Sequence, residues 1–213
     1  MFSIIVNFKV YREGFGKEGK GLLREISNVR KDGYDVYFAV PHADLHLAEL
    51  YGNVIAQHVD PYSEGAHTGS VIMEHLIDYG VKASLLNHSE KKIGRKAIEE
   101  TIRAADSLGF RLYICSENLE ETRFLCESGA NYVAYEPPEL IGGNVSVATS
   151  KPEIIRESTD ICKSYGVKLL VGAGVRNSND VSISSSLGAE GILVSSGIVR
   201  SKQPEHSLNS LMI

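Results

Sequence analysis

A carboxylate that could act as a general base directly follows one of the short apolar runs of this 213-residue chain. Glu136 comes after the run 132–135, and two prolines follow it, which restrict the backbone and disfavour a helix at this exit. An apolar tip and two glycines, residues 140–143, then give the pattern of a lid that closes over a substrate. Closure would exclude water and raise the basicity of a carboxylate, so we predict Glu136 to be a catalytic base.

Polar side chains also end two other apolar runs. Asn7 and Lys9 end the first run of the chain, and His88 and Glu90 follow the run 83–87. A helix N-terminus beside His88 would disfavour its cationic form and leave a neutral hydrogen-bond donor. Lys9 can bind an oxyanion or a phosphate, and Glu90 can pair with Lys9 and fix it. Each side chain has an ordinary alternative, as a solvated residue, a structural histidine or, for Glu90, an acid that stabilises a helix dipole.

Small residues follow the last two apolar runs. Gly172, Gly174, Ser195 and Ser196 would let backbone N–H groups approach an anion closely, at the start of helices that add a positive dipole end. These loops are therefore candidate phosphate-binding segments. The same glycines could equally be required only for tight turns.

Eight short apolar runs alternate with helical patterns and indicate the elements that position these residues. The predicted strands are 3–8, 35–40, 54–57, 83–87, 111–115, 132–135, 168–171 and 191–194. The predicted helices include 95–108, 118–128, a helix with Ser150 as its N-cap and Pro152 in its first turn, 177–187, and a short helix opened by Pro204. Eight repeats without a linker predict one α/β domain over 1–213, a (β/α)8 barrel of parallel strands, with an open doubly wound sheet as the structural alternative.

Composition narrows the classes of function. The net charge of −5 argues against a broad nucleic-acid-binding surface. No apolar run approaches the length of a membrane span, and the N-terminus lacks the basic segment of a signal peptide. Cys115, Cys126 and Cys162 are an odd number without paired spacing, which predicts buried, reduced thiols in a cytoplasmic protein.

Five motifs in this order resemble the triosephosphate isomerases in their short archaeal form. They are Asn7-x-Lys9, Gln57-His58-Val59-Asp60-Pro61, Gly65-Ala66-His67-Thr68-Gly69, His88-Ser89-Glu90 and Glu136-Pro137-Pro138-Glu139-Leu140-Ile141-Gly142. The resemblance covers essentially the whole chain. It implies a single TIM barrel that interconverts dihydroxyacetone phosphate and glyceraldehyde 3-phosphate without a metal or cofactor.

The resemblance also implies roles for individual residues. Glu136 would transfer the proton, neutral His88 would polarise the carbonyl, and Lys9 with Asn7 would stabilise the enediolate, a pairing of Glu base and His electrophile that is known for the family. The phosphate would be bound by the backbone of Ile141, Gly142, Gly143, Gly174, Ser195 and Ser196. A homodimer or higher homo-oligomer is implied, with Thr68 at the tip of an interface loop that reaches the neighbouring site.

Three positions depart from the family pattern. The lid continues as Gly142-Gly143-Asn144, which could stiffen or rebond its second hinge. Val175 lacks the hydroxyl that many relatives place there, so phosphate contact at that point must use the backbone. Phe8 replaces the commoner tryptophan.

Other classes of function remain as alternatives. Residues 14–19 spell G-x-G-x-x-G with Asp35 further on, but five residues separate the motif from the first strand, which argues against dinucleotide binding. A phosphate-binding epimerase or aldolase would need metal ligands or an inner-strand lysine. His42 and His46 are spaced i, i+4 but fit a solvated helix face, and Lys168 stands at the wrong end of its strand. A purely structural barrel would not require the set of polar strand ends.

Overall fold

The computed structural model describes residues 1–138 and 147–212, and within them eight parallel strands form a closed barrel. The strands are β1 (Phe2–Asn7), β2 (Tyr34–Val40), β3 (Val54–Ala56), β4 (Ala83–Leu86), β5 (Arg111–Ser116), β6 (Tyr132–Tyr135), β7 (Lys168–Val171) and β8 (Gly191–Val194). The α-helices are α1 (Gly16–Ile26), α2 (Met73–Asp78), α3 (Arg95–Leu108), α4 (Leu119–Glu127), α5 (Val147–Ser150), α6 (Pro152–Ser164), α7 (Ser178–Ser186), α8 (Ser196–Val199) and α9 (Pro204–Asn209). Short 3-10 helices cover η1 (Arg12–Gly14), η2 (His42–Glu49) and η3 (Ser89–Lys91).

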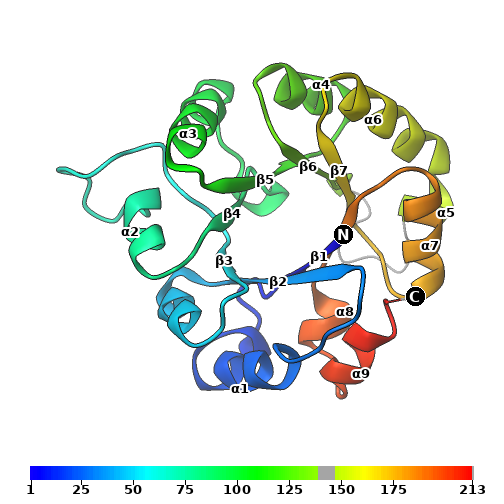
Figure 1. Ribbon diagram of the computed structural model, residues 1–213, viewed down its shortest axis with the longest axis horizontal. Coiled ribbons are helices and arrows are strands. Elements are labelled where there is room, and N and C mark those ends of the chain that lie inside the picture. The colour runs from blue at the N-terminus through cyan, green and yellow to red at the C-terminus, as the bar shows by residue number, and fades with distance from the viewer. Residues whose placement is uncertain (139–146, 213) are drawn as a thin grey trace.

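Each strand pairs in parallel with the next, and β1 also pairs with β8, which closes the sheet. Figure 1 shows the strands as a central ring and the helices as an outer ring. The predicted barrel is therefore confirmed, and the open doubly wound sheet is excluded. All eight predicted strands exist, with ends that differ by at most one residue.

Alternation along the strands divides the core into two layers. Successive side chains of a strand point to opposite faces of a sheet, so one set lines the barrel interior and the other meets the helices. Ile5, Leu85, Ala134 and Leu193 belong to the inner cluster, which is separate from the larger cluster between strands and helices. The same alternation of side chains continues for one or two residues past several strand ends, where it determines which polar residues face the barrel mouth.

Helix ends follow their local sequence, with two corrections. α3 begins at Arg95 and ends at Leu108, and Gly109 adopts a left-handed φ of 64° that stops the helix. Asn118, the first residue of the helix predicted over 118–128, is instead the N-cap of α4, and its side chain accepts a hydrogen bond from the Glu121 N–H. Ser150 is not the N-cap of α6, because α5 includes it and Lys151 takes the N-cap position without a capping side-chain bond.

The glycines of the G-x-G-x-x-G stretch have a packing role at the start of α1. A Cβ on Gly14 would lie 2.5 Å from the carbonyl oxygen of Phe8, and one on Gly19 would lie 2.6 Å from the carbonyl carbon of Gly14. Gly16 has a positive φ of 60°. Close backbone contact between the first loop and α1 thus explains these glycines without a dinucleotide.

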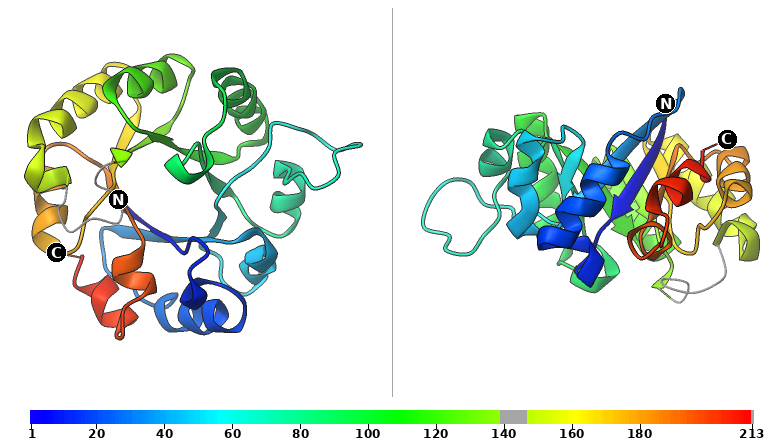
Figure 2. Two further views of the ribbon diagram at one scale, coloured as in Figure 1. Left: turned by 180° about the vertical axis from the view of Figure 1, so that it is seen from behind. Right: turned by 90° about the horizontal axis from the view of Figure 1, so that it is seen from below.

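The loop between β3 and α2 extends away from the barrel in both views of Figure 2. Its base is fixed, because the Asp60 carboxylate accepts a hydrogen bond from the Val71 N–H at 2.8 Å. Residues 62–69 are exposed along their whole length. Thr68, the residue predicted at the tip of an interface loop, lies in this exposed segment.

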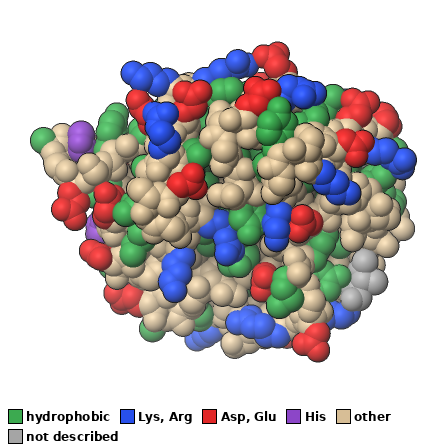
Figure 3. All heavy atoms as spheres, turned by 45° about the horizontal axis from the view of Figure 1, so that its top comes forward, with side chains coloured by type: hydrophobic (Ala, Val, Ile, Leu, Met, Phe, Trp, Pro, Cys, Tyr) green, Lys and Arg blue, Asp and Glu red, His purple; other side chains and the backbone are tan. Residues whose placement is uncertain are grey.

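Surface charge is mixed on the face that Figure 3 displays, where Lys and Arg side chains alternate with Asp and Glu. This distribution offers no extended basic stripe on that face. Among the helices of the described residues, none combines the length and apolar character needed to cross a membrane.

Candidate active site

A pocket at the carboxyl ends of the strands brings most of the predicted site residues together. Its lining includes Asn7, Lys9, Tyr11, His88, Glu136, Ala173, Gly174, Val175, Arg176, Leu193, Val194, Ser195, Ser196 and Gly197. Glu90 lines an adjacent pocket with Asn7, Lys9 and His88. The predicted residues 141–143 and Asn144 lie outside the described residues.

Strand alternation explains why several of these side chains face the pocket. Glu136 stands two residues after Ala134, and Ser195 stands two residues after Leu193, both members of the inner cluster. Asn7 likewise follows the inner residue Ile5 by two positions. An inward-facing register at the end of each strand therefore carries a polar side chain to the mouth.

Glu136 occupies an unusual environment for a carboxylate. It is 7% exposed, and burial raises its pKa to about 7, against the opposing influence of Lys9. Its Oε2 lies 3.4 Å from Nε2 of His88, yet this buried oxygen has no hydrogen-bond partner among the described residues. An unsatisfied carboxylate oxygen with a pKa near neutrality is suited to accept a proton from a bound molecule.

Gly172, which the sequence predicts to be a phosphate-binding residue, lies beside Glu136. It does not line the pocket, and a Cβ at this position would lie 2.5 Å from Oε1 of Glu136 and 2.7 Å from its Cδ. The absence of a side chain at Gly172 therefore gives the Glu136 carboxylate its space.

The His88 ring is held as a neutral donor. Nδ1 accepts a hydrogen bond from the Glu90 backbone N–H at 3.1 Å, which leaves the ring proton on Nε2. Burial lowers the pKa of His88, and the positive charge of Lys9 lowers it further. Nε2–H therefore faces the pocket on the side of Glu136.

Lys9 is fixed by bonds at both ends of the residue. Its Nζ lies 2.7 Å from Oε1 of Glu90, so the predicted pair is present in the structure. Its backbone has a positive φ of 48°, stabilised by a bond from its N–H to the Asn7 side chain and one from Gln57 to its carbonyl. Only 11% of the side chain is exposed, so the ammonium group is held at the pocket wall.

Cys115 is a neighbour of the site that sequence reasoning assigned only to the core. The residue is 3% exposed, and burial, followed by the adjacent Glu136 carboxylate, raises the pKa of its thiol. The thiol hydrogen-bonds the carboxylate and lowers the pKa of Glu136 somewhat. Its place two residues after Tyr113, a large inward side chain, could have indicated an inward position. All three cysteines are free and buried, as predicted.

The opposite wall of the pocket consists of the loops after β7 and β8. Gly174 has a positive φ of 73°, and the Ser195 hydroxyl donates to the Asn7 carbonyl at 2.6 Å. Arg176, which sequence reasoning did not single out, lines this wall as an exposed cation. It has no ion pair within the described part of the chain, so its positive charge is free to act on an anion.

Metal-binding residues do not converge in the part of the chain that the structure describes, where no group of three or more His, Cys, Asp or Glu could hold an ion. His42 Nε2 contacts the His58 carbonyl, whereas His46 Nδ1 contacts the Ala43 carbonyl, so the two histidines have separate structural partners.

Comparisons with known proteins agree with this geometry. The family model described as triosephosphate isomerase matches residues 2–211. Triosephosphate isomerase of Thermoplasma volcanium is 47% identical over the full length of both chains. The Archaeoglobus fulgidus enzyme of that name is 37% identical, covering 100% of this chain and 97% of its own, and the one from Methanothermus fervidus is 34% identical, covering 98% and 96%. With a parallel barrel, a buried carboxylate and a histidine at its mouth, and relatives that match from end to end, the chain belongs to the triosephosphate isomerase family.

Proposed function

We propose that this protein interconverts dihydroxyacetone phosphate and glyceraldehyde 3-phosphate, with Glu136 as the base. The observation that supports this role is the buried, unpaired oxygen of Glu136 beside Nε2 of His88. The carboxylate removes a proton from one carbon of the substrate and returns it to the neighbouring carbon. A pKa near 7 suits both steps, because the group is then neither too weak a base nor too weak an acid.

His88 and Lys9 stabilise the charge that develops on the substrate oxygens. The neutral Nε2–H of His88 donates a hydrogen bond to the carbonyl, and the ammonium group of Lys9 faces the enediolate. Glu90 neutralises and orients Lys9 before substrate binds, since the two groups are 2.7 Å apart. Asn7 supports the Lys9 backbone from one side. The reaction needs no metal or cofactor.

The phosphate group binds across the pocket from Glu136. Backbone N–H groups of Gly174, Ser195 and Ser196 face the anion, and we assign the same role to residues 141–143 on the basis of sequence. We also keep Gly172 in the phosphate-binding segment after β7, as assigned from the sequence, although a side chain there would meet Glu136. Arg176 adds a positive charge at the rim. The alternative of an aldolase finds no support, since Lys168 is exposed at the start of β7 and lies 3.4 Å from Glu190.

A single substitution tests the assignment of the base. Glu136→Gln preserves shape but cannot accept the proton, so kcat in a coupled isomerisation assay should fall by about 10²–10⁴-fold. The control is Glu153→Gln, which changes an exposed carboxylate of α6. Near-wild-type turnover by the folded Glu136→Gln protein would refute the role proposed for Glu136.

We further propose that the protein forms a homodimer or a higher homo-oligomer through the exposed loop 62–69. The loop is ordered by its own contacts, including stacked rings of Tyr62 and His67 4.4 Å apart. A hollow lies beside Lys9 and the exposed Val10. Thr68 would enter this hollow on the neighbouring subunit. Sedimentation of a variant with a charged Thr68→Asp substitution should show dissociation, and an unchanged mass would contradict this interface.

A further inference from the structure

The backbone at the end of β4 departs from the alternation that places the other site residues. Ala83 and Leu85 face the barrel interior, so a regular continuation would present Asn87 to the mouth. Asn87 instead has a positive φ of 57° and is 1% exposed, and the next residue, His88, lines the pocket. A left-handed backbone costs a non-glycine residue about 1–2 kcal/mol, although Asn tolerates it better than most. Surrounding contacts must therefore hold this conformation.

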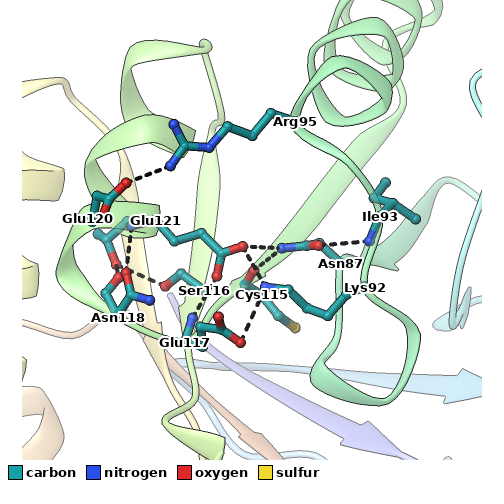
Figure 4. Close-up of polar contacts among 11 residues, drawn as sticks. Asn87, Lys92, Ile93, Arg95, Cys115, Ser116, Glu117, Asn118, Glu120 and Glu121 are labelled. Carbon is teal, nitrogen blue, oxygen red and sulfur yellow. Dashed lines mark hydrogen bonds and ion pairs between the residues drawn. The ribbon is translucent and has the colours of Figure 1, made fainter.

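Those contacts engage the whole Asn87 amide. Its Nδ2 donates to the Cys115 carbonyl at 3.0 Å and to Oε1 of Glu121 at 2.8 Å. Its Oδ1 accepts from the Ile93 N–H at 3.2 Å, which closes the loop that contains His88. Figure 4 shows the amide with Cys115 of β5 and Glu121 of α4 on one side and Ile93 on the other. The turn that presents His88 is thus tied to two other elements.

Glu121 is the hub of this network. One carboxylate oxygen accepts from Asn87 and also from Nζ of Lys92, which belongs to the same loop as His88. The other oxygen accepts from the Glu117 N–H at 2.9 Å. The Glu121 N–H is bonded to the N-cap Asn118 at 2.8 Å, so the carboxylate is fixed by the start of α4.

We propose that Glu121, acting through Asn87 and Lys92, is a positioning residue that fixes His88 in its catalytic orientation. The inference rests on the electrophilic role proposed for His88. Glu121 lines neither pocket at the mouth, and its effect is transmitted through the backbone turn at Asn87. A displacement of about 1 Å in a catalytic group can cost about 10²-fold in rate, so release of this turn should be visible in kcat.

The first turn of α4 supplies a matched control. Glu120 precedes Glu121 and forms an ion pair with Arg95, but both side chains are largely exposed and neither contacts Asn87 (Figure 4). Glu120→Gln and Glu121→Gln remove the same charge from the same helical turn. The Glu121 carboxylate accepts hydrogen bonds from Asn87, Lys92 and the Glu117 N–H. Only Glu121→Gln places a side-chain NH2 group against one of these donors.

The test compares kcat, substrate KM and inhibition by inorganic phosphate for these two variants. We expect Glu121→Gln to lower kcat about tenfold. The inhibition constant of inorganic phosphate should stay unchanged, because the proposed phosphate-binding loops follow β7 and β8, whereas Glu121 belongs to α4. Glu120→Gln should keep the wild-type kcat. Equal kcat values for the two variants, or a parallel loss of phosphate binding in Glu121→Gln, would overturn the inference.

A second substitution keeps the proposal testable if Glu121→Gln does not fold. Asn87→Gly retains the left-handed backbone without strain and removes only the amide bonds. It should lower kcat to a similar extent, and a wild-type kcat for Asn87→Gly would contradict the proposal by itself. If Glu121→Gln folds, the double variant should be about as slow as the slower single variant, since both act through one link. Multiplicative losses would show independent effects and contradict a shared path.

His88→Gln distinguishes a failure of the electrophilic role proposed for His88 from a failure of the positioning role proposed for Glu121. If this variant keeps the wild-type kcat, the electrophilic role of His88 fails, and the positioning inference fails with it. If it is slow while Glu121→Gln and Asn87→Gly remain fast, the role of His88 stands and only the positioning inference is refuted.

Discussion

The buried carboxylate of Glu136 should contribute less to stability as the pH rises, and Glu136→Gln should remove this contribution. Burial raises the pKa of Glu136 to about 7 in the folded state, whereas an unfolded chain exposes it to water. Between about pH 4.5 and about pH 7 the folded state keeps a proton that the unfolded state has released. The contribution of Glu136 to the free energy of unfolding therefore falls across this window and levels off above it.

The magnitude follows from the size of the pKa shift. A shift of the Glu136 pKa from its ordinary 4.5 to about 7 corresponds, at roughly 1.4 kcal/mol per pKa unit, to about 3 kcal/mol in total. Glu136→Gln also introduces an amide that lacks a partner, but this cost is independent of pH. The difference in free energy of unfolding between Glu136→Gln and the wild type therefore reports the ionisation of Glu136. From about pH 5 to about pH 8 this difference should change by about 2–3 kcal/mol in favour of the variant.

Urea unfolding of both proteins at each pH measures this difference. The protein concentration is held fixed, because oligomer formation stabilises the folded state by mass action. Glu153→Gln is the control, since water surrounds that side chain in both states, and its difference from the wild type should stay constant. A Glu136→Gln difference that is also independent of pH would refute the claim that burial of Glu136 opposes its charge.

Three further predictions concern the same site. Deleting residues 140–142, the tip of the lid predicted from sequence, should increase release of inorganic phosphate from the enediolate during turnover, and release equal to the wild type would contradict the lid. Gly172→Ala should lower kcat about tenfold or more, because its Cβ would displace Glu136, whereas Gly21→Ala meets no atom within 4 Å and should have no effect. Infrared titration of the wild type minus Glu136→Gln should show a carboxylate that ionises near pH 7, and ionisation near its ordinary pKa of 4.5 would contradict the effect of burial.

The sequence alone determined the elements and the positions of the main polar groups. Short apolar runs gave all eight strands, because strands buried on both faces need continuous apolar side chains. Glu136 and Ser195 could be placed at the mouth because each directly follows such a run, and Asn7 because it stands at the end of one. The N-cap of α6 was misplaced because Ser150 belongs to a preceding helical turn that local sequence does not distinguish.

Only the tertiary structure decided the chemistry of those groups. The raised pKa of Glu136 depends on burial at the barrel mouth, beside Gly172 after β7 and Cys115 on β5, which lie far from it in sequence. Closure of the barrel could not be read from periodicity, because an open sheet has the same alternation. The turn at Asn87 was equally hidden, since two groups that bind its side chain, the Cys115 carbonyl and the Glu121 carboxylate, come 28 and 34 residues later. Local pattern fixes which face a residue occupies, while contacts between distant segments fix its charge and orientation.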